Sequence, residues 1–427
     1  MLPGMKPVVV ITFHCRAAAN AGPLTRMLAE ARRELAETQR KAWLKAGAAD
    51  AVIVEGEPDG LSFGERLAAE VGRRLAATAE AATERGSAAD DDAGTPEVAR
   101  GDEAGTTDGP AKAGVGGVIV LGSGSIPMAR SREMRQLVFA AAGDAGHALA
   151  NNRYSADVVA VSRAADLASL PPLPADNALP RWLEEKAGVA VTDLRKNWRL
   201  GVDVDTPLDL LLLGGEAGEE VARTAPLVGE RLGALYEVLP NRRAELLIAG
   251  RVSTATLRWL ERAAACRVRA LVEERGLRAA TVLAQSGATT GSRPPRSVLG
   301  ELLDRDGPES LAHHVAQMAD AAVIDTRVLM AHRCGADERR WPDPEDRYAS
   351  DLLLPQTIAD PWLRALTQSA IDSSAPIVLG GHTMVNGGLR LLARRSKPGE
   401  AEAEPERPEG AAEGATEEEP RRAEAEA

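Results

Sequence analysis

Two aspartates near the middle of the chain, Asp203 and Asp205, have the spacing that is most informative about chemistry. They alternate along the short run Leu-Gly-Val-Asp-Val-Asp at positions 200–205, which ends at Thr206 and Pro207. On a strand, side chains two residues apart lie on the same face, so both carboxylates would point the same way. Paired carboxylates suit a divalent cation such as Mg²⁺, and the N-terminus of a following helix favours bound phosphate.

The same stretch also has a purely structural interpretation. A leucine-rich helical pattern begins at Pro207, so Asp205 or Thr206 would cap the helix, Pro207 would take its first position, and Asp209 would lie in its first turn. Spacing alone does not separate capping from ligand binding. The polar loops elsewhere in the chain favour ligand binding.

Alternating strand and helix patterns predict an α/β fold for residues 1–215, with a mainly parallel sheet and flanking helices. In such sheets ligands bind beyond the carboxyl ends of the strands, where we expect the polar loops 14–26, 122–128 and 203–206. The predicted strands or extended stretches are 7–13, 51–54, 117–121, 157–161, 189–194 and 201–205, and the predicted helices are 24–46, 64–77, 131–142 and 179–186.

Two of the polar stretches contain candidate ligands for a nucleotide. Ser123 and Ser125 lie in a Gly/Ser loop whose hydroxyls and backbone N–H groups could contact an anion. Asn151, Asn152 and Arg153 form a run of amides and a guanidinium that could read a base or hold phosphates. The structural alternatives are a strand-to-helix turn for the first and an Asn-Asn turn for the second.

Composition excludes several classes of protein. The net charge is −12, but two acidic segments, 78–113 and 396–427, carry the surplus, so the rest of the chain is nearly neutral and lacks the basic stripe of a nucleic-acid binder. Three widely separated cysteines indicate neither disulfides nor a zinc site. With no long apolar run, we expect a cytoplasmic protein without membrane contact. Residues 78–113 are predicted to be a disordered insertion and 396–427 a disordered acidic tail.

Residues 216–395 predict a second, α-rich domain with a small α/β element, for which we identify no family. Helical periodicity dominates 216–275, and strands are expected at 321–324 and 376–379. Gly380-Gly381-His382-Thr383 is a candidate anion loop. We expect the other polar residues of this domain to form helix caps and ion pairs rather than a metal site. These residues are Asp320, Asp325, His332, Asp351 and His382. Arg251 and the residues 273–275 are expected to form ion pairs on helix surfaces.

Several stretches of residues 1–215 resemble the nucleotide-diphospho-sugar transferase fold, and within it the small nucleotidyltransferases. Residues 204–210, Val-Asp-Thr-Pro-Leu-Asp-Leu, are similar to the family's terminal Asp-Thr-Pro-Glu-Asp-Leu segment. Residues 118–123 resemble its central strand and metal-binding loop, and 45–48 its helix-to-strand passage. The molybdenum-cofactor nucleotidyltransferases and 2-phospho-lactate guanylyltransferase are of this type.

The resemblance implies a metal-dependent protein that transfers an NMP from an NTP to a small phosphorylated or hydroxyl acceptor. Mg²⁺ would lie on Asp205, with Asp203 beside it. The family's first loop is glycine-rich with an Arg and a Lys for the triphosphate. Here Arg16 lies in a loop with one glycine, and Arg26 and Lys41 are the possible substitutes.

A second departure concerns the metal. The family's other metal-binding Asp, after the central strand, is replaced by Ser123-Gly124-Ser125. Two alternatives therefore remain beside the nucleotidyltransferase. One is a non-catalytic nucleotide-binding or regulatory module. The other is a glycosyltransferase that uses a nucleotide-sugar. The acceptor and the oligomeric state are not specified by the sequence.

Overall fold

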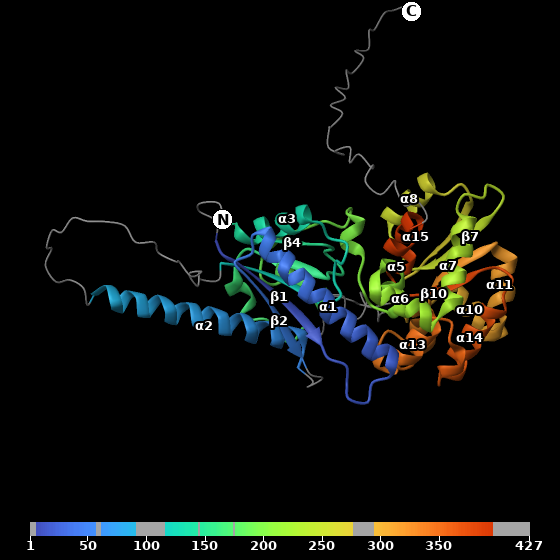
Figure 1. Cartoon of the computed structure of the whole chain (residues 1–427), viewed down its shortest axis with the longest axis horizontal. Helices are drawn as coiled ribbons and strands as arrows, with labels where there is room; N and C mark the ends of the chain where they lie inside the picture. Colours follow the sequence, from blue (N-terminus) through green and yellow to red (C-terminus); the bar gives the residue numbers. More distant parts are fainter. Residues whose placement is uncertain are drawn as a thin grey trace, which may run out of the picture.

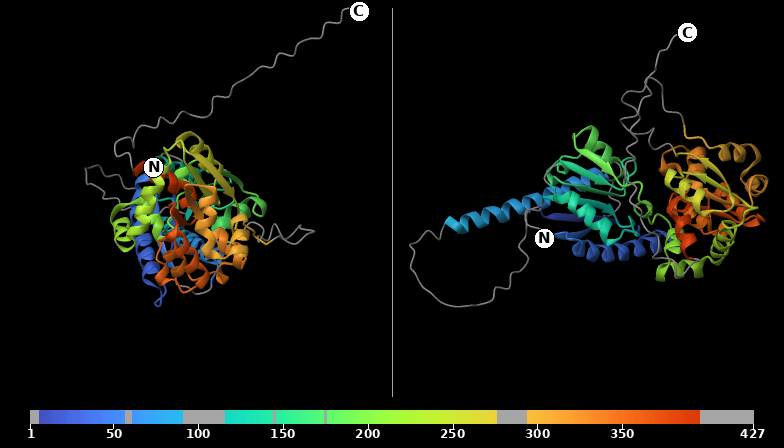
Figure 2. Two further views of the ribbon diagram at one scale, coloured as in Figure 1. Left: turned by 90° about the vertical axis from the view of Figure 1, so that its right-hand side faces the viewer. Right: turned by 90° about the horizontal axis from the view of Figure 1, so that it is seen from above.

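The computed structural model of the chain describes residues 6–56, 61–90, 116–143, 146–173, 176–275 and 294–395. Two α/β units lie side by side, each built on its own sheet (Figure 1). The right-hand view of Figure 2, from above, shows the same division, with the strands of each unit at its centre. The α/β class predicted from the sequence is thus confirmed.

Six strands form the first sheet, in the order β2-β1-β3-β5-β4-β6. Strand β5 runs antiparallel to its neighbours β3 and β4, and the other pairs are parallel, so the sheet is mixed. Because β4 has the direction of β1 and β3, the chain leaves all three strands at the same edge. The strands are β1 Val8–Cys15, β2 Asp50–Gly56, β3 Gly117–Gly122, β4 His147–Ala150, β5 Val158–Val161 and β6 Ala190–Asp193.

Helices cover both faces of this sheet because successive side chains of β1 point in opposite directions. Val8 and Val10 pack with α1 and α3 in one apolar cluster, whereas Val9 and Ile11 pack with α2 and α4 in another. The helices are α1 Pro23–Ala46, α2 Phe63–Asp90, α3 Ser131–Ala142 and α4 Leu179–Glu185.

The predicted disordered segments are only partly within the described chain. Helix α2 extends through residues 78–90, the first part of the stretch predicted to be a disordered insertion. Residues 91–113 and the acidic tail 396–427 lie outside the described residues.

Four parallel strands form the second sheet, in the order β10-β9-β7-β8. Strands β9 (Ala321–Asp325) and β10 (Ile377–Gly380) lie where the sequence predicted them. Strands β7 (Glu245–Gly250) and β8 (Arg267–Val272) lie inside the stretch 216–275 that was predicted to be helical. A short apolar run such as β7 has no periodicity that separates strand from helix, and β8 is a half-exposed edge strand.

Helices surround the second sheet and connect it to the first unit. Within the stretch 216–275, where helical periodicity dominates the sequence, helix α8 spans only Thr254–Ala263. The remaining helices are α5 Pro207–Leu213, α6 Gly215–Thr224, α7 Pro226–Val238, α10 Val298–Asp306, α11 Leu311–Met318, α12 Thr326–Cys334, α13 Pro344–Asp351, α14 Pro361–Asp372 and α15 Leu389–Arg395.

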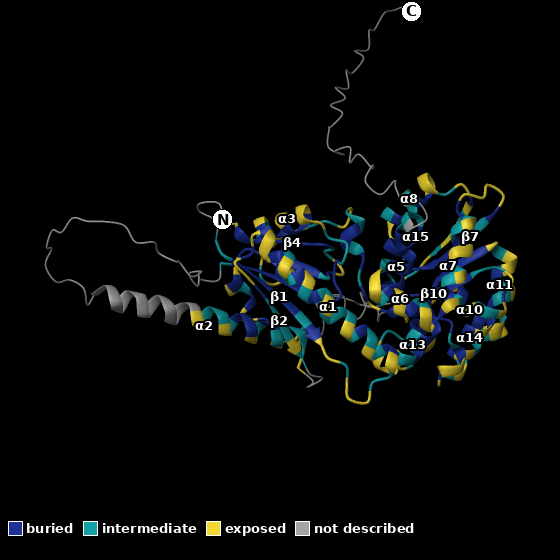
Figure 3. Ribbon diagram, in the orientation of Figure 1, coloured by how far each residue is buried: buried dark blue, intermediate teal, exposed yellow. Residues whose placement is uncertain are grey.

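The second unit and the end of the first share one apolar core. Leu24 and Leu28 of α1, together with Val204 and Leu208, belong to the same buried cluster as the strands of the second sheet. Figure 3 shows β7 and β10 as largely buried and the outer helix faces as exposed. Separating the units would expose this cluster to water, so burial of apolar area holds them together.

Glycines after β10 allow the segment 380–388 to pack closely against residues 202–212. A Cβ at Gly380 would lie 3.1 Å from Leu208 Cδ2, and one at Gly388 only 2.9 Å from Leu212 Cδ1. Both distances are tighter than ordinary contacts, so larger residues would push the two segments apart.

A buried ion pair joins two elements of the second unit. The Arg327 guanidinium donates to Asp351 through Nη1 at 2.5 Å and Nη2 at 2.7 Å, and both side chains are buried. Arg327 also donates to Thr326 Oγ1 at 2.9 Å. The pair ties α12, which follows β9, to α13. In the interior a charge that loses its partner is costly.

We therefore expect Asp351→Asn to lower the free energy of unfolding by about 3–5 kcal/mol, because Arg327 would keep its buried charge without a carboxylate. Urea unfolding followed by circular dichroism measures this. Asp337→Asn is the control, since it breaks an exposed pair with Arg339 and should leave stability nearly unchanged. Equal effects of the two substitutions would contradict a structural role for the buried pair.

Candidate functional site

The segment containing Asp203 and Asp205 crosses from the first unit to the second. Its described backbone forms no strand at 201–205, contrary to prediction. Asp203 makes an isolated antiparallel bridge with Ser125 instead. The Thr383 hydroxyl, from the second unit, donates to the Asp203 carbonyl oxygen at 2.8 Å and accepts from its N–H at 3.2 Å. Long-range contacts with both units replace the expected strand.

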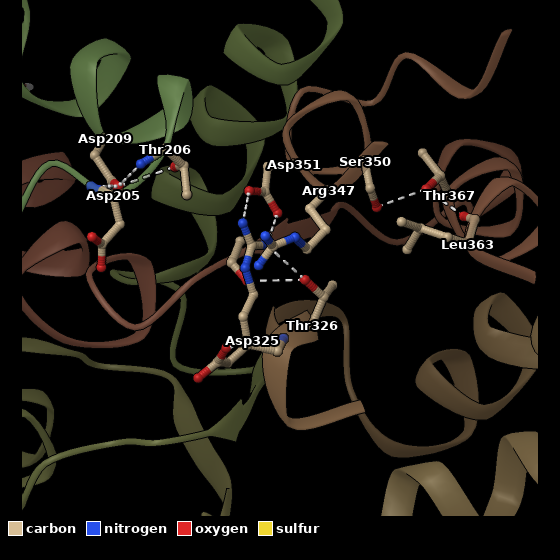
Figure 4. Close-up of polar contacts among 12 residues, drawn as sticks. Asp205, Thr206, Asp209, Asp325, Thr326, Arg347, Ser350, Asp351, Leu363 and Thr367 are labelled. Atoms are coloured by element: carbon tan, nitrogen blue, oxygen red, sulfur yellow. Dashed lines mark hydrogen bonds and ion pairs between the residues drawn. The ribbon is translucent and has the colours of Figure 1, made fainter. Parts of the chain in front are cut away.

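The capping interpretation of this stretch is confirmed. The Asp209 carboxylate accepts hydrogen bonds from the N–H groups of Asp205 and Thr206, at 2.9 and 2.8 Å, and from the Thr206 hydroxyl at 3.0 Å (Figure 4). Asp209 is buried, and burial followed by the charge of Asp205 raises its pKa to about 7. Asp209 therefore sets the backbone at 205–206 rather than binding a ligand.

Asp205 is different, because its side chain is 53% exposed. Its Oδ1 accepts from Arg32 Nη2 at 3.1 Å, and among the described residues no hydrogen bond to Oδ2 is found. Burial by the surrounding protein tends to raise the Asp205 pKa, but Arg32, then His382 and Arg251, lower it overall. Asp205 thus presents an ionised, accessible carboxylate that is nevertheless surrounded by protein.

Arg32 is a site residue that the sequence analysis missed. Its Nε donates to the Val204 carbonyl oxygen at 2.5 Å, so the side chain holds both the backbone and the carboxylate of the 204–205 segment. A signal was present: Leu24, Leu28, Arg32 and Ala36 recur every four residues, which places a guanidinium on the buried stripe of α1. A charge in that position needs a partner from another element.

The carboxyl edge of the second sheet faces the same region. Arg251 follows β7 and Asp325 ends β9. Arg251 Nε and Nη2 donate to the two carboxylate oxygens of Asp325 at 2.6 and 3.1 Å. The assignment of Arg251 to a helix surface is therefore wrong, whereas Asp325 caps α12 as predicted by accepting from the Arg327 N–H at 3.2 Å. Asp325 is fully buried, so its charge is not available to a ligand.

His382 lies at this edge as well, in the loop that follows β10. Its imidazole is half-buried, and no hydrogen bond of its ring is found within the described chain. Burial and then the charge of Arg251 lower its pKa to about 4. The ring is therefore neutral at physiological pH and offers one donor and one acceptor.

A hollow of about 560 Å³ opens at the carboxyl edge of the first sheet. Arg16 and Arg33 both donate to the Glu55 carboxylate, at 2.6 and 2.8 Å through their Nε atoms. Arg26 donates to the Ala21 carbonyl oxygen, and among the described residues it pairs with no carboxylate. The hollow is lined by His14, Arg16, Ala17, Arg26, Ala29, Glu30, Arg33, Glu34 and Glu55. Arg16 and Arg26, two predicted phosphate ligands, are thus brought together.

The N-terminus of α1, beside this hollow, is already capped by a carboxylate side chain. Glu345 of α13 accepts from the N–H groups of Leu24 and Thr25 at 2.9 and 3.0 Å and from the Thr25 hydroxyl at 2.8 Å. These are the groups that would hold a phosphate at a helix N-terminus. An anion in the hollow would therefore meet side-chain guanidinium groups.

The remaining predicted ligands are used elsewhere. Ser123 Oγ lies 3.1 Å from His14 Nδ1 and is buried. Ser125 is also buried, and its carbonyl oxygen accepts from Gln39 Nε2 at 2.7 Å. Lys41 lies two residues beyond Gln39, on the opposite side of α1, and is exposed. Lys41 is therefore not directed at the 203–205 segment.

The polar run 151–153 stabilises its own turn. Asn151 is buried and donates to Asp157 Oδ2 and to the Leu200 carbonyl oxygen, both at 2.7 Å. The Asn152 side chain accepts from the Tyr154 N–H at 3.0 Å, and Arg153 pairs with Glu184 at 2.8 Å. The Asn151 side chain thus hydrogen-bonds to protein groups. Asn152 and Arg153 lie at the carboxyl edge of β4.

The fit of the site to Mg²⁺ depends on Asp205. Among the described residues, no three His, Cys, Asp or Glu side chains are grouped as a metal site. Asp203 Oδ1 accepts from the Val204 N–H at 2.9 Å, whereas no residue in the described ranges donates to Asp205 Oδ2. Mg²⁺ often binds through one or two carboxylates plus substrate phosphates. Asp205 fits that mode, but the described residues contain no preformed metal cage.

Comparison of the chain with known protein families, with curated proteins and with solved structures gives no match. No helix in the described ranges has the length and apolar character needed to span a membrane. The function must therefore be inferred from the residues and their geometry.

The raised pKa of Asp209 predicts a pH-dependent stability. Between its ordinary value of 3.8 and about 7, folded Asp209 keeps a proton that the unfolded chain has released, so the free energy of unfolding falls as pH rises through this window. Asp209→Asn removes this contribution. We expect the stability of the variant relative to the wild type to increase by a few kcal/mol from about pH 4 to about pH 7.

Urea unfolding at several pH values measures the difference. Asp346→Asn is the control for hydrogen bonding, because Asp346 is also a buried carboxylate that accepts from two backbone N–H groups. A difference between Asp209→Asn and the wild type that stays constant with pH would show that Asp209 is ionised in the folded chain.

Proposed function

We propose that the protein is a metal-dependent nucleotidyltransferase whose reaction centre is Asp205. The observation that carries the proposal is the half-exposed, ionised carboxylate of Asp205, which Arg32 orients at the junction of the two units. Three features support it: the α/β sheet with its polar loops at one edge, the hollow containing Arg16 and Arg26, and the Asp-Thr-Pro sequence at the start of α5.

The residues of the chain have separate roles in this proposal. The NTP would occupy the hollow at the edge of the first sheet, with Arg26 as the cation whose charge no carboxylate balances among the described residues. An oxygen of the acceptor attacks the α-phosphorus, the bond to the β-phosphate breaks, and pyrophosphate leaves. Asp205, with the substrate phosphates, would hold Mg²⁺, which neutralises charge in this step. Asp209 and Arg32 fix the position of the Asp205 backbone and side chain.

A non-catalytic nucleotide-binding module is the second candidate. The observation in its favour is that Ser123, at the position of the second metal-binding Asp in the resembling family, hydrogen-bonds to His14 and is buried. A nucleotide would then bind in the hollow without a metal. A glycosyltransferase on the same frame would instead prefer a nucleotide-sugar.

Calorimetry with each NTP, with and without Mg²⁺, tests the proposal. We expect Mg²⁺ to strengthen binding, and Asp205→Asn to remove that gain while leaving metal-free binding intact. Asp50→Asn is the matched control: Asp50 is also 53% exposed and pairs with one arginine, Arg74, at 3.2 Å, but it lies at the amino end of β2. Binding that does not depend on the metal would favour the module, and preference for a nucleotide-sugar the glycosyltransferase.

The hollow makes an independent prediction. Arg26→Gln should weaken NTP binding roughly ten- to 150-fold, with or without Mg²⁺, because a charged hydrogen bond to phosphate is worth about 1.5–3 kcal/mol. Lys41→Gln should leave the affinity unchanged, since Lys41 lies about two turns beyond Glu34 along α1 and does not line the hollow. If Lys41→Gln weakened binding and Arg26→Gln did not, the nucleotide would not occupy this hollow.

A further inference from the structure

The connections of the second sheet mark one place where a ligand is expected. The chain passes from β7 to its neighbour β8 and then crosses to β9, on the other side of β7, before β10. The connections that leave β7 and β9 therefore run in opposite directions. In open parallel α/β sheets, ligands bind outside the carboxyl ends of the strands at such a switch point.

The residues at this switch point carry charge and hydrogen-bonding groups that the proposed nucleotide hollow does not use. Arg251 follows β7, Arg275 lies three residues beyond β8, and His382 follows Gly380 and Gly381 at the end of β10. Asp325, at the end of β9, is buried and holds Arg251 in place through two hydrogen bonds. Arg275 pairs with Glu338, and its side chain is 18% exposed.

One accessible side chain lies beside these groups. Asp205 faces the same region from the first unit and is half exposed, and Arg251, Arg275 and His382 each influence its pKa. A Cβ at Gly381 would lie 3.8 Å from Thr206 Cγ2 and 4.0 Å from Arg327 Nε, so the loop that carries His382 packs against residues next to Asp205 and Asp325.

Two neighbouring guanidinium groups at this edge offer hydrogen-bond donors to an anion. Arg251 and Arg275 lie close enough that burial and the Arg251 charge lower the pKa of Arg275, despite the carboxylates of Glu338 and Asp325. An anion would relieve this repulsion. Guanidinium groups bind phosphate oxygens with particular geometric fit, and a neutral imidazole adds a donor. A carboxylate has only two oxygens, so it would accept fewer hydrogen bonds from these groups than a phosphate would.

We propose that the carboxyl edge of the second sheet is a second ligand site, which binds the phosphate group of a small molecule between Arg251, Arg275 and His382, opposite Asp205. The identification of this molecule as the acceptor rests on the proposed function, because the site and the nucleotide hollow would then flank one carboxylate. The binding of phosphate itself does not depend on the proposed function.

Titration of the full-length protein with inorganic phosphate and with glycerol 3-phosphate, without nucleotide or Mg²⁺, tests the site. The readouts are calorimetry and the NMR signals of the His382 ring. We expect both ligands to bind, to shift the His382 signals, and to lose roughly tenfold in affinity in Arg275→Gln. Tighter binding of glycerol 3-phosphate would identify a phosphorylated small molecule, and equal binding would identify free phosphate as the ligand.

Two variants keep the outcome unambiguous. His382→Asn should also weaken binding and tests the site if Arg275→Gln is unstable. Arg267→Gln is the matched control, because Arg267 begins the strand that Arg275 follows and so lies at the opposite edge. Arg251 is not substituted, since its loss would leave Asp325 buried without a partner.

Three results would overturn this site: no binding at millimolar phosphate, binding unaffected by both Arg275→Gln and His382→Asn, or binding lost only in Arg26→Gln. Each is separable from failure of the proposed function, which is measured by Mg²⁺-dependent NTP binding and its loss in Asp205→Asn. Retention of that binding in Arg275→Gln would show that the two sites are distinct.

Discussion

Close packing of residues 202–212 against residues 380–388 is the constraint on which the candidate site depends. Glycines at 380 and 388 let the backbones approach, and the shared apolar cluster makes separation costly. Thr383 adds two hydrogen bonds to the backbone of Asp203. Because this contact joins the end of the first unit to the carboxyl edge of the second sheet, Asp205 is positioned by both units. A change in the packing would move the carboxylate relative to Arg251 and His382.

Differences in burial decide which charges at this junction are available for function. Asp325 and Asp351 are buried and are each satisfied by one arginine, so they support the structure. Asp209 is buried as well, and its hydrogen bonds go to the backbone before α5. Asp205 alone among these four carboxylates is half exposed, so its oxygen that accepts no hydrogen bond from the described residues is accessible to a ligand. Residue type alone could not have distinguished it from the others.

Two groups of the first unit that could have met a bound phosphate or metal are used within the protein. The N–H groups at the start of α1 are capped by Glu345, and the buried Ser123 hydroxyl hydrogen-bonds to His14. The proposed chemistry therefore depends on side-chain cations in the hollow and on one carboxylate. In such an arrangement the substrate phosphates would supply most of the metal ligands, so metal and nucleotide binding would be coupled.

The sequence by itself determined the local features: the strand and helix alternation of the first unit, the buried strands β9 and β10, and the cap formed by Thr206 and Asp209. Apolar periodicity and capping act within a few residues, so they can be read directly. Only the tertiary structure decided that Asp203 bridges Ser125, that Arg32 holds Asp205, and that 151–153 form a satisfied turn. Each of these depends on partners distant in sequence, and so does the edge strand β8, whose local pattern also suits a helix. Long-range pairing has no periodic signal, which is why the site emerged from the fold.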